Sequence, residues 1–116
     1  MARIVHAEAE NQPYMGKVLV AKVILNRVEG DSWFGNTIPE VIYKGNGSQF
    51  NAISRGCFKR GEYTEEDMQA VKEAYDLEGY DELLYFYNKA ISTDKEFVYS
   101  MTNREVLQVG NHTFSR

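Results

Sequence analysis

Hydrophobic and polar positions divide this chain into a helical first part and a strand-rich last third. Residues 14–28 carry apolar side chains around most of a helical circumference, which is typical of a helix at the buried centre of a domain. Residues 2–10 predict a shorter amphipathic helix. Pro13 separates the two, because proline lacks an amide donor and disfavours helical geometry at Gln12. We therefore expect a short helix that leads into a buried central one.

Two further helices are predicted from their start signals. Thr37 with Glu40 three residues later has the form of a capping box, which predicts a short helix through residues 41–43. Thr64, followed by three acidic residues, predicts a helix that ends near Leu77. Its expected apolar face consists of Met68, Val71 and Tyr75.

The last third is rich in β-branched and aromatic residues. Residues 83–87, 96–99 and 106–114 read as strands on this basis. Gly110 is expected in a turn or a bulge. Helices followed by a small sheet indicate an α+β fold, and the length of 116 residues indicates a single domain over residues 1–116.

Charge and hydropathy exclude several classes of protein. The 13 basic residues are outnumbered by 17 acidic ones, so nucleic acid is not an expected partner. No apolar run approaches the roughly 18 residues of a membrane span, and no secretion signal is visible. Either the protein needs no signal of its own or this is a domain of a longer precursor.

The residues that most often bind metals are scarce. Cys57 is the only cysteine, and a half-buried structural thiol is the favoured interpretation. His6 and His112 are the only histidines, and a His-Glu-x-x-His motif is absent. We therefore expect no metal and no cofactor.

Glu8 is the strongest candidate for chemistry. It shares a helical face with Ile4, and apolar neighbours disfavour the charged form of a carboxyl group and so raise its pKa. A raised pKa suits a general acid that protonates a glycosidic oxygen. Glu10 points away from this face, so the two do not form a carboxylate pair across one bond. From position alone, an exposed glutamate on a helix rim remains the simpler interpretation.

Three other clusters have both a functional and a structural interpretation. Gln49 and Phe50 follow a glycine-rich loop and could contact sugar, or serve as a loop residue and a core residue. Alternating residues of a strand share a side, so the rings at positions 85 and 87 could stack on sugar or pack in the core. The pair Asn111 and His112 ends the last strand, where His112 could be structural or part of a site.

Taken together, these segments resemble the SleB/CwlJ-type cell wall hydrolases, the spore cortex-lytic enzyme family. The resemblance covers nearly the whole chain, and the order and spacing of its short pieces make it specific. These pieces are Ala7-Glu8-Ala9, Pro13-Tyr14-Met15-Gly16, Ile24-Leu25-Asn26-Arg27-Val28, Asn36-Thr37-Ile38, Val41-Ile42-Tyr43, Gln49-Phe50, Leu84-Tyr85-Phe86-Tyr87-Asn88 and Gly110-Asn111-His112-Thr113-Phe114.

The resemblance implies a lysozyme-like α+β fold with a groove between the helical lobe and a small antiparallel sheet. It implies cleavage of peptidoglycan between N-acetylmuramic acid and N-acetylglucosamine by a lytic transglycosylase, possibly in spore cortex, without a cofactor. The family's catalytic glutamate matches Glu8. The residues expected to bind substrate are Tyr43, Gln49, Phe50, Tyr87, Asn88, Asn111 and His112.

Two departures from the family pattern affect these expectations. Gln12 stands where the family usually has a second glutamate, so activity is in question if that position helps catalysis. The loop at residues 44–48 differs from the family's shorter loop that contains proline, which leaves the substrate preference open.

The alternatives are a hydrolytic muramidase of the same fold and a non-catalytic glycan-binding module. The expected partners are peptidoglycan glycan strands, and a regulatory protein partner is left unidentified. The expected location is the cell wall or the spore cortex and coat, for a stand-alone, excised or phage-related domain.

Overall fold

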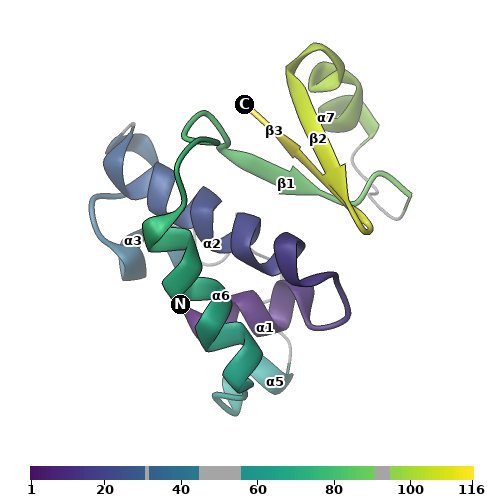
Figure 1. Ribbon diagram of the computed structural model, residues 1–116. Coiled ribbons are helices and arrows are strands. Elements are labelled where there is room, and N and C mark those ends of the chain that lie inside the picture. The colour runs from purple at the N-terminus through teal and green to yellow at the C-terminus, as the bar shows by residue number, and fades with distance from the viewer. Residues whose placement is uncertain (31, 45–55, 91–94) are drawn as a thin grey trace.

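The computed structural model describes residues 1–30, 32–44, 56–90 and 95–116, and it has α+β architecture (Figure 1). Helices come first, followed by a three-stranded antiparallel sheet, as the sequence predicts. The helices before the sheet are α1 (Ala2–Ala9), α2 (Tyr14–Glu29), the 3-10 helix η1 (Ser32–Phe34), α3 (Ile38–Ile42), α5 (Gly56–Lys59) and α6 (Glu65–Asp76). The remaining elements are β1 (Tyr85–Tyr87), α7 (Lys95–Ser100), η3 (Thr102–Arg104), β2 (Glu105–Val109) and β3 (His112–Ser115).

Helix α2 is the buried centre, in agreement with its apolar sequence. Its middle turns, residues 18–21, are fully buried. Two hydrophobic clusters share it. One joins α1, α2 and α6 to Leu83 and Phe114, and the other joins α1 and the end of α2 to Phe34, α3 and α5. Helix α1 contributes to both, Val5 to the first cluster and Ile4 to the second. The backbone that carries Glu8 is therefore held on two sides.

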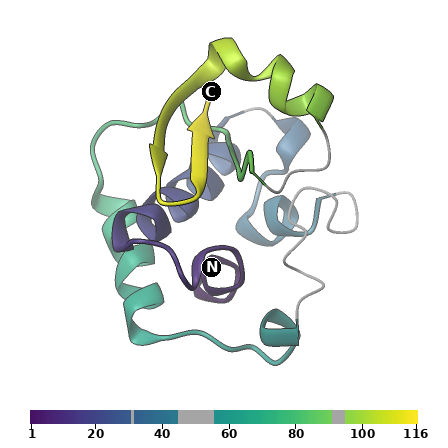
Figure 2. The same ribbon diagram turned by 90° about the vertical axis from the view of Figure 1, so that its right-hand side faces the viewer.

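The sheet has the strand order β1-β3-β2, with β3 in the middle. Phe86 pairs with Phe114 across β1 and β3, and Val109 pairs with His112 at the turn of the hairpin formed by β2 and β3. This turn lies against the start of α2, where Val109 approaches Gly16 (Figures 1 and 2). The hairpin turn is thus seated at the start of the central helix, next to the end of α1.

The structure corrects three details of the predicted elements. Residues 96–99 belong to helix α7 rather than a strand. The segment 106–114 is a hairpin of two strands, because Gly110 turns the chain with φ of +58°. Tyr75 is 59% exposed, and the buried positions of α6 are Asp67, Ala70, Val71 and Ala74.

The predicted threonines, Thr37 and Thr64, are the N-cap residues of α3 and α6. The Thr64 side chain and Asp67 form a complete capping box at α6. At α3, the Thr37 hydroxyl accepts from the Glu40 amide, whereas the Glu40 carboxylate accepts from the amide of Asn36. Within the ranges described, the helices all fall short of the length and hydropathy needed to cross a membrane.

Candidate active site

Glu8 lies near the end of α1 and is partly buried. The residues on either side of it, Ala7 and Ala9, are buried, and so is Ile4 one turn earlier. These small and branched side chains pack α1 against α2, which fixes the backbone from which Glu8 projects. The structure thus places this carboxyl group at the margin of the core rather than on an open helix rim.

Arg27 provides a cation next to this carboxyl group. Its Nε donates a hydrogen bond to the Leu84 carbonyl at 2.7 Å, and its guanidinium lies 4.6 Å from the ring centre of Phe34 and 5.4 Å from that of Tyr85. Burial lowers the pKa of Arg27 to about 10, while attraction to Tyr85 and Glu8 opposes this decrease. Arg27 therefore remains a cation at neutral pH and attracts Glu8 electrostatically.

Asn26 fixes the chain that leads into β1. Its amide nitrogen donates to the carbonyls of Tyr80 at 2.9 Å and Leu83 at 2.8 Å. Tyr80 itself has φ of +59°, a left-handed conformation that a non-glycine residue adopts only when its surroundings enforce it. Together with Arg27, Asn26 thus ties the last turn of α2 to the backbone just before Tyr85.

The roles of Asn26 and Arg27 were not predicted from the sequence. One signal was present, because both are polar residues in a helix that is otherwise apolar around most of its surface. A buried polar side chain requires a partner, and the partner here is backbone more than 50 residues away in the sequence.

Gln12 connects the turn after α1 to the β2–β3 hairpin. Its side-chain carbonyl accepts a hydrogen bond from the Asn111 amide at 2.8 Å. Gly110 permits this approach, because a Cβ at that position would lie 2.6 Å from Cδ of Pro13 and would also meet the Gln12 oxygen. A glutamate could accept the same bond, so Gln12 retains the acceptor that this contact needs.

Four of the predicted substrate-binding residues lie on or beside the sheet. Tyr87 is buried, and its ring packs edge-on against Phe97 of α7 at 5.4 Å. Asn88 accepts from the Ala90 amide at 3.0 Å, and Asn111 is exposed in the hairpin turn. His112 is buried against Phe86, with ring centres 5.2 Å apart, and burial lowers its pKa. Tyr87 and His112 thus have the surroundings of packed residues, and their contact with substrate stays a prediction.

The other predicted binding residues follow α3. Tyr43 is 50% exposed, and one edge of its ring packs on Phe58 at 6.2 Å, which leaves a ring surface accessible to a ligand. Gln49 and Phe50 lie outside the described residues. As predicted, Tyr85 and Tyr87 share one side of β1, where both contact Phe97.

Comparison with known proteins supports the same family. A family model described as Cell Wall Hydrolase matches residues 11–115. A spore cortex-lytic enzyme of Bacillus cereus is 33% identical over the whole chain, and one from Bacillus subtilis (strain 168) is 30% identical over 98% of it. The chain spans 42% and 35% of these two curated relatives.

Solved structures resemble the fold over its whole length. The catalytic domain of the germination-specific lytic transglycosylase SleB from Bacillus anthracis has a TM-score of 0.84 and 31% identity, and the match covers 100% of this chain and 90% of that one. The catalytic domain of Bacillus cereus SleB has a TM-score of 0.82 and 32% identity, and the match covers 100% of this chain and 86% of that one. On these matches, the chain belongs to the Cell Wall Hydrolase family.

Proposed function

We propose that this protein is a lytic transglycosylase that cleaves peptidoglycan between N-acetylmuramic acid and N-acetylglucosamine, with Glu8 as its catalytic acid and base. The observation that carries the proposal is the position of Glu8, half-buried beside the cation of Arg27. It occurs in a chain that matches a lytic transglycosylase catalytic domain along its whole length. We infer a lysozyme-like groove between the helices and the sheet as the place where the glycan binds.

A single carboxyl group can perform both halves of this reaction. Protonated Glu8 gives its proton to the glycosidic oxygen, and the bond between that oxygen and C1 of the muramic residue breaks. The substrate's own acetamide stabilises the positive charge that develops at C1. Glu8, now a carboxylate, accepts the proton of the 6-hydroxyl while that oxygen bonds to C1. The product is a 1,6-anhydro ring, no water is consumed, and Glu8 is protonated again.

Arg27 supports the second half of this cycle. Its cation, buried and held by Leu84, attracts the carboxylate that Glu8 becomes once it has protonated the glycosidic oxygen. The Gln12 contact shows that the residue at the position of the usual glutamate still binds the hairpin at Asn111, so the change to glutamine keeps this link. Among the proposed glycan contacts that the structure describes, Tyr43 and Asn111 are exposed and so accessible to a ligand.

The proposed substrate is peptidoglycan of the cell wall, and spore cortex in particular. The curated relatives are spore cortex-lytic enzymes, and the solved structure with a TM-score of 0.84 is described as germination-specific. On this proposal the site of action is the cell wall or the spore cortex and coat.

The test is digestion of purified spore cortex and vegetative peptidoglycan, followed by mass spectrometry of the fragments. Wild type should produce anhydromuramic ends, which are one water lighter than reducing ends. Glu8→Gln should abolish them while its melting temperature stays near that of wild type. Glu29→Gln, at the exposed end of α2, is the matched control and should remain active. Reducing ends would indicate a hydrolytic muramidase, and intact glycan with wild type would indicate a binding module.

A further inference from the structure

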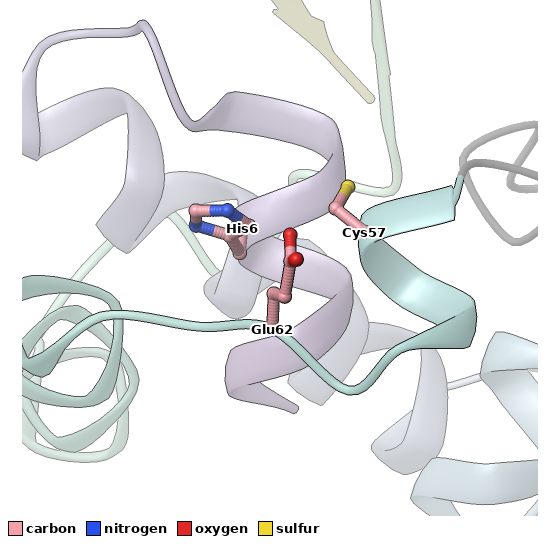
Figure 3. Close-up of side chains that lie close together, drawn as sticks. All are labelled: His6, Cys57 and Glu62. Atoms are coloured by element: carbon pink, nitrogen blue, oxygen red, sulfur yellow. The ribbon is translucent and has the colours of Figure 1, made fainter.

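A cluster of three different metal-binding side chains lies on the face of α1 that meets α5. His6, Cys57 and Glu62 each place one ligand atom within 4.8 Å of the other two (Figure 3). The thiol of Cys57 is buried and free, and the His6 side chain is only 12% exposed. The three residues come from two separate segments, and other contacts hold each segment in this position.

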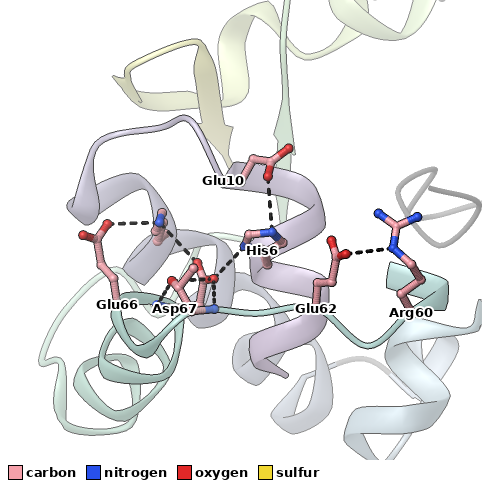
Figure 4. A network of polar contacts seen from close by, with 8 residues as sticks. His6, Glu10, Arg60, Glu62, Glu66 and Asp67 are labelled. Atoms are coloured by element: carbon pink, nitrogen blue, oxygen red, sulfur yellow. Dashed lines mark hydrogen bonds and ion pairs between the residues drawn. The ribbon is translucent and has the colours of Figure 1, made fainter. Parts of the chain in front are cut away.

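The orientation of the His6 ring is fixed from one side. Its Nδ1 lies 2.8 Å from Oδ2 of the fully buried Asp67, so we assign Nδ1–H as the donor of a hydrogen bond to that carboxylate. Asp67 is held in turn by Lys17 at 3.2 Å and by Thr64 at 2.8 Å (Figure 4). A carboxylate that orients one ring nitrogen while the other faces a metal is the usual arrangement around histidine ligands.

The second nitrogen of His6 faces another acceptor. Its Nε2 lies 3.2 Å from Oε2 of Glu10, one helical turn later. With Nδ1 turned to Asp67, Nε2 is the ring nitrogen that remains for a metal beside this carboxylate. Two ligand atoms each about 2.0–2.1 Å from a tetrahedral zinc lie roughly 3.3 Å apart. The observed separation therefore fits two ligands of one metal ion.

The backbone brings Cys57 and Glu62 together. The Glu62 amide donates to the Cys57 carbonyl at 2.9 Å, and the Gly61 amide donates to Phe58 at 3.0 Å, with Gly61 at φ of +73°. This is the Schellman arrangement that ends a helix, and it places these two side chains next to each other. Arg3 fastens the segment to α1 with a hydrogen bond of 2.7 Å to the Phe58 carbonyl.

We propose that His6, Cys57 and Glu62 form a structural zinc site, and that the Glu10 side chain, which contacts His6, turns in to supply the fourth ligand. Sulfur and imidazole ligands together select zinc over calcium or magnesium, which prefer oxygen. Glu62 is 46% exposed on its side chain, so it can turn to complete the tetrahedron while its second oxygen stays near Arg60. Zinc bound here joins α1 to α5 and so stiffens the helix that carries Glu8. It takes no part in cleavage of the glycan.

The sequence did not indicate this site, because its four ligands do not have the spacing of any zinc motif. Cys57 and Glu62 are five residues apart, and they lie about 50 residues from His6 and Glu10. Only the packing of α5 on α1 joins the two pairs.

The test is metal binding by the full chain after treatment with a chelator. Titration with zinc alone should show one high-affinity ion and a higher melting temperature. Cobalt should give the charge-transfer absorption of a thiolate ligand and the intense visible bands of tetrahedral geometry. Cys57→Ser should remove the thiolate absorption. Cys57→Ser and Glu62→Gln should each weaken zinc binding by at least about tenfold, because loss of a direct ligand exceeds the effect of losing a supporting partner.

Glu78→Gln, another exposed glutamate, is the matched control and should bind zinc as wild type does. Glu62 is at the surface, so its substitution tests the site even if Cys57→Ser fails to fold. Absence of high-affinity zinc binding would overturn the proposal. Zinc binding unchanged in Glu62→Gln would overturn it as well. None of these measurements depends on cleavage of peptidoglycan.

Discussion

Replacement of Asn26 by leucine tests the connection between the central helix and the sheet. Leucine has a similar size and fits an apolar helix, so the change removes the amide while leaving the packing nearly intact. The Leu83 carbonyl then loses this donor, and the Tyr80 carbonyl keeps its bond from the Leu83 amide. We expect a large loss of stability from a substitution that increases hydrophobicity.

The magnitude follows from the burial of the two bonds. The bond to Leu83 is buried, and an orphaned buried carbonyl costs about 1–3 kcal/mol. The bond to Tyr80 is partly buried, and its loss costs about 0.5–1.5 kcal/mol because water can replace it. The sum is about 1.5–4.5 kcal/mol. With an unfolding entropy of roughly 2.1 cal/mol/K per residue, the 116 residues convert this into a decrease in melting temperature of about 6–18 °C.

The assay is thermal and urea unfolding of Asn26→Leu beside wild type. Asn36→Leu, at an exposed asparagine, is the matched control and should change the free energy of unfolding by less than about 0.5 kcal/mol. If the free energy of unfolding of Asn26→Leu were lower than that of wild type by less than about 1 kcal/mol, these two hydrogen bonds would not be what holds the segment before β1. The reasoning would then be refuted.

Two further predictions concern pH and the hairpin. Burial lowers the pKa of His112, so below about pH 6.5 the unfolded chain binds more protons than the folded one. The free energy of unfolding should therefore decrease as the pH falls from that value through the lower pKa of the folded state. His112→Gln should flatten this slope in urea titrations, and an equal slope in both proteins would contradict the assignment. Gln12→Ala should cost about 0.5–1.5 kcal/mol through loss of the acceptor for Asn111, whereas Gln12→Glu should cost less. Equal losses in the two variants would argue against that contact.

Much of the helical part was predictable because local signals decide it. Pro13 and the apolar run after it located α2 to within one residue, and the threonine caps located the start of the two later helices. Residues 96–99 were predicted wrongly because Phe97, Val98 and Tyr99 favour strands locally, whereas in the fold they form a helix whose Phe97 packs on Tyr85 and Tyr87. Tertiary contact overrides local preference there.

The candidate active site shows the same division. Glu8 could be proposed because its helix and its family resemblance are both local features of the sequence. Arg27 could not be placed beside it, because the position of Arg27 depends on the carbonyl of Leu84, 57 residues later. The pairing of His6 with Asp67 spans 61 residues and was out of reach for the same reason.

The central position of α2 also determines when this protein can fold during synthesis. The apolar helix leaves the ribosome before the residues that cover it, which are Ala70, Val71 and Ala74 of α6 and finally Phe114. Until the β2–β3 hairpin has been made, the nascent chain exposes a long hydrophobic surface and is prone to aggregate or to bind chaperones. Phe114 thus completes the core, and any fragment that ends before it should be recovered as insoluble protein.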